Sequence, residues 1–305
     1  MKKIGWLVAA LLTTATMWAQ TSQEEFLSRY NLLVGKVGPD GLGVETLVGK
    51  WEAAFPDDVD MLCAKFSYYY SKAQRSEVVA KSQERFLGAE PILTLNDSTG
   101  AKVNYFTEVF FDDEMYGVAS QALDKAIRTR SDDISLRFSK ISSLLNYEKE
   151  SPDMATQDLK SLIDYHYTSH PTWKYGEDPF SEEDFHGAMM EYAYALFRVG
   201  SPAAYASFRT LSEKMLSYDP KDTDFLNSLG SYYLVCQKDY KTAQKYYAKT
   251  LKLDPDNYAA IKNSVLLARK TGNVKQEKKF LQSLMRVSPD EMERASAKIR
   301  LEALK

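Results

Sequence analysis

The sequence predicts an all-α fold, a solenoid of stacked helical hairpins with one small β-hairpin or loop insertion. The most legible evidence is residues 229–257, where apolar residues recur every three or four positions on two segments separated by a short turn. A proline ends such a unit at Pro220, Pro255 and Pro289, at intervals of 35 and 34 residues. The composition, 44% hydrophobic and 27% charged over 305 residues, supplies enough apolar material for a long core.

The first nineteen residues, 1–19, differ in composition from the rest of the chain. Lys2 and Lys3 precede an apolar run, and small residues follow up to Ala19, which is the layout of a secretory signal peptide. We expect cleavage between Ala19 and Gln20, because the apolar run is too short for a membrane span. An uncleaved membrane anchor is the alternative. Cleavage would leave a periplasmic or secreted protein without a transmembrane segment, and it would change the net charge from −3 to −5.

The next segment, 20–90, is predicted to hold degenerate N-terminal helical repeats, with one helix ending at Pro56 and a first helix following it. Residues 91–111 then break the helical period. Two alternating runs, "ILTL" and "VNYFTEVFF", flank the turn residues "NDSTGAK", which favours an inserted β-hairpin. An extended loop is the alternative.

Residues 112–221 are predicted to hold further degenerate repeats. Ala119, Leu123 and Ala126 have the spacing of a second helix. The region is interrupted by an aromatic loop at 170–185, which carries two prolines and a glycine. Such a loop either folds over a neighbouring groove or fills the gap left by an irregular repeat, and the second role is favoured.

The clearest repeats lie in residues 222–289, and 290–305 has the charge of a solvated capping helix. The first helix carries a large apolar residue, a Leu-Gly pair and an aromatic residue; the second carries alanine, an aromatic residue and proline. These positions are Leu226, Leu229, Gly230, Tyr233, Ala243, Tyr247 and Pro255. The pattern resembles a tetratricopeptide (TPR) repeat, although the inter-helix turn is one residue long for this pattern.

The resemblance implies a right-handed superhelix whose groove is lined by the first helices and holds an extended peptide or a partner's helix. Carried onto this chain, the groove positions are Met190, Tyr194, Phe197, Asn227, Ser231, Leu234, Lys262, Leu266 and Arg269. Their aromatic and basic character suits a peptide with an apolar anchor and an acidic terminus. Where the family's carboxylate-clamping groove has Lys and Asn, this chain has Asn227 and Ser231, so that specific activity is not supported.

No cofactor-binding motif is predicted. A phosphate-binding loop needs four residues between its first glycine and the Gly-Lys pair, followed by Ser or Thr. Gly43 and Gly49 are separated by five residues, and Trp51 follows Lys50. The acidic net charge also makes a nucleic-acid partner a poor match.

No catalytic or metal site is predicted either. His166 and His170 share a helical spacing, but Tyr167 stands where a metalloprotease needs its glutamate. The cysteines at 63 and 236 are 173 positions apart, several repeats in a solenoid, so two free thiols are expected.

The sequence therefore favours a non-enzymatic module that binds a protein or peptide. One alternative is a protein that binds carbohydrate or an envelope polymer through exposed aromatic residues such as Trp173 and Tyr175. The less favoured one is a metal-dependent hydrolase that uses His166 and His170.

Overall fold

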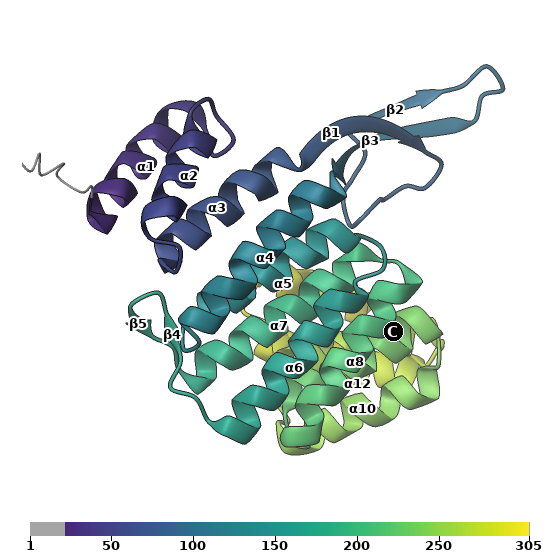
Figure 1. Ribbon diagram of the computed structural model, residues 1–305. Helices are drawn as coiled ribbons and strands as arrows, with labels where there is room; N and C mark the ends of the chain where they lie inside the picture. Colours follow the sequence, from purple (N-terminus) through teal and green to yellow (C-terminus); the bar gives the residue numbers. More distant parts are fainter. Residues whose placement is uncertain (1–21, 305) are drawn as a thin grey trace, which may run out of the picture.

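The computed structural model describes residues 22–304, which form an elongated stack of helices with a projecting β-sheet (Figure 1). The predicted signal peptide lies outside the described residues. The helices are α1 (Gln23–Val37), α2 (Val44–Ala54), α3 (Val59–Lys72), α4 (Asp113–Thr129), α5 (Ile134–Glu148), α6 (Asp153–Ser169), α7 (Glu182–Val199), α8 (Pro202–Tyr218), α9 (Thr223–Ser231), the π-helix η1 (Tyr232–Gln237), α10 (Tyr240–Leu253), α11 (Tyr258–Lys270), α12 (Val274–Val287) and α13 (Glu291–Ala303). The strands are β1 (Gln74–Lys81), β2 (Leu93–Asn96), β3 (Lys102–Phe111), β4 (Lys174–Tyr175) and β5 (Asp178–Pro179).

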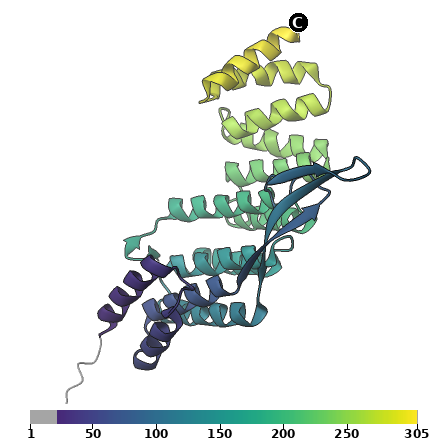
Figure 2. The ribbon, with the colours of Figure 1, turned by 90° about the horizontal axis from the view of Figure 1, so that it is seen from above.

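Successive helices pack as hairpins, which confirms the predicted all-α solenoid. The pairs are α1 with α2, α3 with α4, α5 with α6, α7 with α8, α9 with α10, and α11 with α12, and α13 covers α12. Figure 2 shows these pairs stacked one on another from the N-terminal to the C-terminal end. In the described part of the chain, no helix has both the length and the apolar character needed to cross a bilayer.

Short polar side chains start most of these helices. Each accepts a hydrogen bond from a backbone N–H of the first turn, which is worth about 1 kcal/mol. The capping residues are Ser22, Asp58, Asp112, Asp133, Ser181, Ser201, Asp222, Asp239, Asn257, Asn273 and Asp290. Because the caps fix where each helix begins, they keep the connections short and the hairpins tightly paired.

The TPR-like hairpin of α9 and α10 is held by a close contact at Gly230. A Cβ atom there would lie 2.4 Å from Cε1 of the buried Tyr247, so a larger residue cannot fit without movement. The extra residue of this hairpin is not in the inter-helix turn. It lies in η1, because a π-helix takes one more residue per turn than an α-helix. Lys238 then leaves the helix in the left-handed conformation, with φ of 54°.

The insertion differs from the prediction in both size and start. It is a three-stranded antiparallel sheet of order β1-β3-β2, and β1 lies inside 20–90, for which the sequence predicts helices. The strand is mostly exposed and is stabilised by pairing along its whole length with β3, a distant partner. The N–H of Asp112 donates to the carbonyl of Ala73 at 2.8 Å, so the two ends of the insertion meet. The sheet is therefore inserted between the two helices of one hairpin, α3 and α4.

Candidate binding groove

A cavity of about 1160 Å³ lies between the inserted sheet and the first helices of two neighbouring hairpins, α5 and α7. The loop 170–185 forms one end of it, through Tyr175 and Phe180. We call this cavity the sheet groove. It is larger than most pockets for small ligands, which hold roughly 300–1,000 Å³. Figures 1 and 2 show how the sheet leaves the N-terminal part of the stack and extends alongside later helices.

The helical wall of the sheet groove is aromatic and rigid. Phe138 of α5 and Tyr192 of α7 pack with their ring centroids 5.7 Å apart, and the Tyr192 hydroxyl lies 3.1 Å from the Phe138 carbonyl, to which it donates. Phe180 meets Phe138 edge-on at 5.7 Å. Burial raises the pKa of Tyr192 to about 12, so its hydroxyl stays protonated and keeps this hydrogen bond. The wall is thus preformed.

The aromatic loop is anchored by one buried side chain and exposes others. Trp173 is 3% exposed, and its Nε1–H donates to Nδ1 of His166 at 3.1 Å. Because Nδ1 accepts, Nε2 of His166 carries the proton that it donates to Glu182, 2.8 Å away. Trp173 thus fills a gap in the stack, whereas Tyr175 and Phe180 line the sheet groove. The loop has both of the roles that the sequence left as alternatives.

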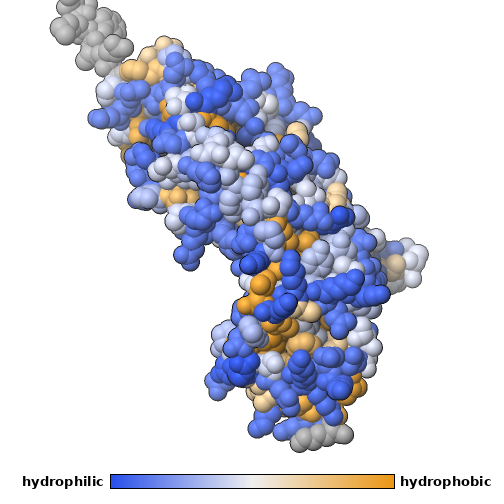
Figure 3. Space-filling model, turned by 90° about the horizontal axis from the view of Figure 1, so that it is seen from below, coloured by the Kyte–Doolittle hydropathy of each residue, from blue (hydrophilic) through white to orange (hydrophobic). Residues whose placement is uncertain are grey.

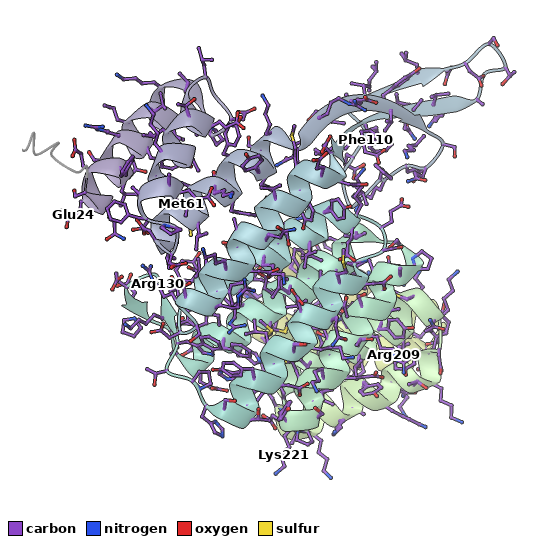
Figure 4. All side chains as sticks on the ribbon, in the orientation of Figure 1. Glu24, Met61, Phe110, Arg130, Arg209 and Lys221 are labelled. Carbon is purple, nitrogen blue, oxygen red and sulfur yellow. The ribbon has the colours of Figure 1, made fainter. Side chains whose placement is uncertain are left out.

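An ion-pair cluster attaches the sheet to α5. The buried carboxylate of Glu108 on β3 accepts from Nζ of Lys149 at 2.8 Å and lies 3.3 Å from Nζ of Lys81. Burial works to raise the pKa of Glu108, but its bonds to these two lysines hold it below the ordinary value. Nζ of Lys149 also lies 4.2 Å from the ring centroid of Phe110, the β3 residue labelled in Figure 4.

The loop between β1 and β2 attaches the sheet to α7 as well. Phe86 is buried against Phe106 of β3, with ring centroids 5.8 Å apart. Gly88 has φ of 76°, and a Cβ atom there would lie 2.5 Å from the carbonyl oxygen of Arg198. The insertion therefore contacts both α5 and the end of α7, and it bridges the groove that these helices form.

The charge of the sheet groove is negative. Its lining holds four carboxylates, of Glu108, Glu183, Asp184 and Glu191, and the ammonium group of Lys149. That ammonium group is paired with Glu108, so it leaves no free positive charge in the lining. Glu183 and Glu191 are exposed along α7. The lining suits a ligand with apolar groups and positive charge.

None of the nine residues predicted to line a groove lies in the sheet groove. On α7, Met190 and Phe197 are half-buried in the core of the stack, and Phe197 meets Phe208 of α8 at 5.1 Å. Tyr194 is 58% exposed, with the Arg198 guanidinium 5.7 Å from its ring centroid. It lies one turn after Glu191 on α7.

The predicted residues on α9, η1 and α11 are largely engaged within the protein. The amide nitrogen of Asn263 donates to Asn227 at 3.1 Å and to Ser231 at 3.2 Å, which brings these two predicted residues together. Leu234 is buried.

The basic positions of α11 also have internal partners. Lys262 pairs with Glu293 at 2.8 Å, and Arg269 pairs with the buried Glu277 at 2.8 Å. Leu266 is exposed.

The histidines do not form the metal pair that the sequence raised. Both ring nitrogens of His166 are engaged, with Trp173 and Glu182, and His170 ends α6 with φ of 45°. Within residues 22–304, His186, Asp222 and Asp224 do come together. Nε2 of His186 is 2.8 Å from Oδ2 of Asp222, whose other oxygen caps α9, so this contact joins α7 to α9.

The two cysteines are free and half-buried. Burial raises the pKa of Cys63 and of Cys236 to about 11, so both stay protonated thiols near neutral pH and are poor nucleophiles.

A second cavity, of about 640 Å³, lies among α10, α11 and α12. Figure 3 shows hydrophobic residues gathered on one face in the C-terminal half of the molecule. The sheet groove is the stronger candidate, because two separate insertions line it and the repeats alone would not form it.

Comparisons with known proteins give the fold little outside support. No protein-family model and no curated protein matches the chain. The solved structure of pilF from Pseudomonas aeruginosa is 10% identical with a TM-score of 0.34, and the match covers 91% of this chain and 96% of that one. The flexible tandem repeat domain from one of the proteins of bacterial cellulose synthase is 16% identical with a TM-score of 0.26, and the match covers 93% of this chain and 97% of that one. At these scores the TPR-like assignment rests on the helical hairpins of this chain.

Proposed function

We propose that this chain is a non-enzymatic interaction module that binds an extended segment of a partner protein in the sheet groove. The observation that carries the proposal is the groove itself. An inserted sheet and an aromatic loop, which the stack does not need as repeats, meet over α5 and α7 and leave a large, lined cavity. Insertions that line one cavity are typical of binding surfaces.

The partner segment should carry apolar side chains flanked by lysine or arginine. The aromatic wall of Phe138, Phe180 and Tyr192 accepts the apolar groups, and the carboxylates of Glu183 and Glu191 attract the basic ones. This differs from the acidic terminus expected from sequence, because Lys262 and Arg269 are paired internally.

The nine residues chosen from sequence enter this proposal unequally. Tyr194 and Leu266 are exposed apolar residues that extend the binding face toward the C-terminal end. Asn227 and Ser231 contribute by fixing α9 against α11 through Asn263.

Carbohydrate binding is the weaker candidate. It depends on exposed aromatic residues, and Trp173 is buried in the stack, where it cannot face a sugar ring. Tyr175 remains exposed, but one exposed ring beside a groove of this length favours a peptide.

A peptide-display selection with the wild-type protein tests the function. We expect the selected peptides to be rich in basic and apolar residues. Ala195→Arg should weaken the binding of a selected peptide at least about tenfold, because this exposed alanine lines the groove and the new side chain brings bulk and positive charge. Ala206→Arg, at an exposed alanine of α8 outside the groove lining, is the matched control. Equal loss in both variants, or in neither, would contradict the proposal.

We also propose export to the periplasm or the medium, from the composition of residues 1–19. N-terminal sequencing of the protein purified from its own cells should give Gln20 as the first residue. A chain that begins at Met1 would contradict export by a cleaved signal peptide.

A further inference from the structure

We propose that the sheet groove holds its ligand as an added β-strand, paired with the free edge of β3 between Thr107 and Phe111. The inference rests on the proposed function and specifies how the ligand is bound. It depends on which backbone groups of β3 lack a strand partner and on which way they point.

One edge of β3 is only partly paired. β1 pairs with β3 from Asn104 to Phe111, whereas on the other side β2 pairs only with Lys102 to Tyr105. Beyond Tyr105, no strand within residues 22–304 continues the ladder on the β2 side.

Hydrogen bonds at the two ends of this stretch fix the direction of its backbone groups. The Tyr105 carbonyl accepts from the N–H of Ile92 at 2.8 Å, on the β2 side, and the Asp112 N–H donates to Ala73, on the β1 side. Consecutive residues of a strand direct their N–H and C=O groups to opposite edges. Thr107, Val109 and Phe111 therefore direct theirs away from β1, toward the unpaired edge.

That edge borders the sheet groove. Thr107, Val109 and Phe111 all belong to its lining, and Glu191 and Ala195 of α7 belong to the opposite wall. An added strand needs about 4.8 Å of room beside β3, and its side chains alternate between the two faces of the sheet. Because the edge is enclosed by α5, α7 and the aromatic loop, it is protected from the non-selective pairing that open edges invite.

The ligand class follows from this geometry. It is an extended peptide of about five residues, the length that pairs with Thr107 to Phe111. Its backbone would bond to β3, while basic and apolar side chains alternate along it. The carboxylates of α7 and the aromatic wall would receive these two kinds of side chain.

The test uses a labelled synthetic peptide, Lys-Phe-Lys-Val-Lys-Phe-Lys, and its counterpart with glutamate in place of lysine. Wild-type protein should bind the basic peptide and bind the acidic one at least about tenfold more weakly. Val109→Pro should weaken the basic peptide's binding about tenfold or more, since it removes an N–H that points to the free edge and leaves the bonds to β1. Val109→Ala keeps the N–H and shortens the side chain, and it should cost less than about threefold. Circular dichroism checks that both variants fold.

A second readout needs no variant. Adding the basic peptide to wild-type protein should slow amide hydrogen exchange at Thr107 and Val109 about tenfold or more, and leave Glu108 and Phe110, which already face β1, unchanged.

The possible results separate the two proposals. Binding that Ala195→Arg removes, but that neither Val109→Pro nor the exchange of Thr107 and Val109 reflects, would overturn strand addition and leave the proposed function standing. Failure of the basic peptide while display selects other peptides that need Ala195 would overturn the ligand class. Failure of every peptide in both experiments would overturn both proposals.

Discussion

Single side chains set how closely the helices of this solenoid approach. At Gly230 the ring of Tyr247 occupies the space in which a Cβ atom would stand, with ring carbons 2.4 to 2.9 Å from that position. Gly117, in the interior of α4, has open space around its Cα. The two glycines therefore differ in what an added methyl group would meet.

Gly230→Ala should lower the free energy of unfolding by about 1–3 kcal/mol, because the methyl group forces α9 and α10 apart or displaces Tyr247. Gly117→Ala should instead raise it by up to about 1 kcal/mol, because alanine favours the helix. Urea unfolding followed by circular dichroism measures both. A Gly230→Ala protein as stable as Gly117→Ala would refute the close contact.

The contact between His186 and Asp222 predicts a pH dependence. The hydrogen bond from His186 to Asp222 raises the pKa of the histidine, although burial opposes the shift. A raised pKa in the folded state means that the stabilisation is fully present below the unfolded pKa of about 6.5 and is lost as the pH rises through the folded value. We expect about 1 kcal/mol of stability to be lost from pH 6 to pH 8 through this pair.

Unfolding midpoints of wild type and His186→Gln across this pH range measure that loss. The variant removes the titrating group, so its midpoint should fall less from pH 6 to pH 8 than that of wild type. Parallel curves for the two proteins would show that the pair does not contribute.

At the scale of elements, the helices could be predicted and part of the insertion could not. Helices such as α10 and α12 are indicated by an apolar stripe and a capping residue, Asp239 or Asn273. β1 has no such signal, since it is mostly exposed and depends on pairing with β3. The same strand hid the partner of α3, because the second helix of that hairpin follows only after the whole sheet.

Replacing residues 74–111 by a short Gly-Ser linker should leave the solenoid folded, because Ala73 and Asp112 already meet. We expect a loss of about 1–3 kcal/mol, mainly from the contacts of Phe111 with Tyr70 and Tyr116. Binding of a selected peptide should disappear. Helical circular dichroism and the urea midpoint report the first effect, and fluorescence anisotropy the second. A shortened chain that binds the peptide as wild type does would exclude the sheet from the site.

At the scale of the whole molecule, the site arises from segments that are distant in sequence. Val109 and Ala195 line one groove only because the insertion bridges α5 and the end of α7. The periodic pattern placed the first helices on the binding face, but it did not contain the path of the sheet. The residues chosen from sequence therefore followed the helices toward α11, past the groove that the insertions form.

Site-specific photo-cross-linking tests whether the sheet groove is where the chain meets its partner. A photoreactive phenylalanine analogue is placed at Ala195 in the groove, at Leu266 on α11, and at Ala206 on α8, in the full chain expressed in its own cells. We expect that Ala195 yields an adduct, that mass spectrometry places the cross-link in a basic, apolar segment of the captured protein, and that Ala206 yields no such adduct. An adduct at Ala206 with none at Ala195 would show that the partner binds elsewhere.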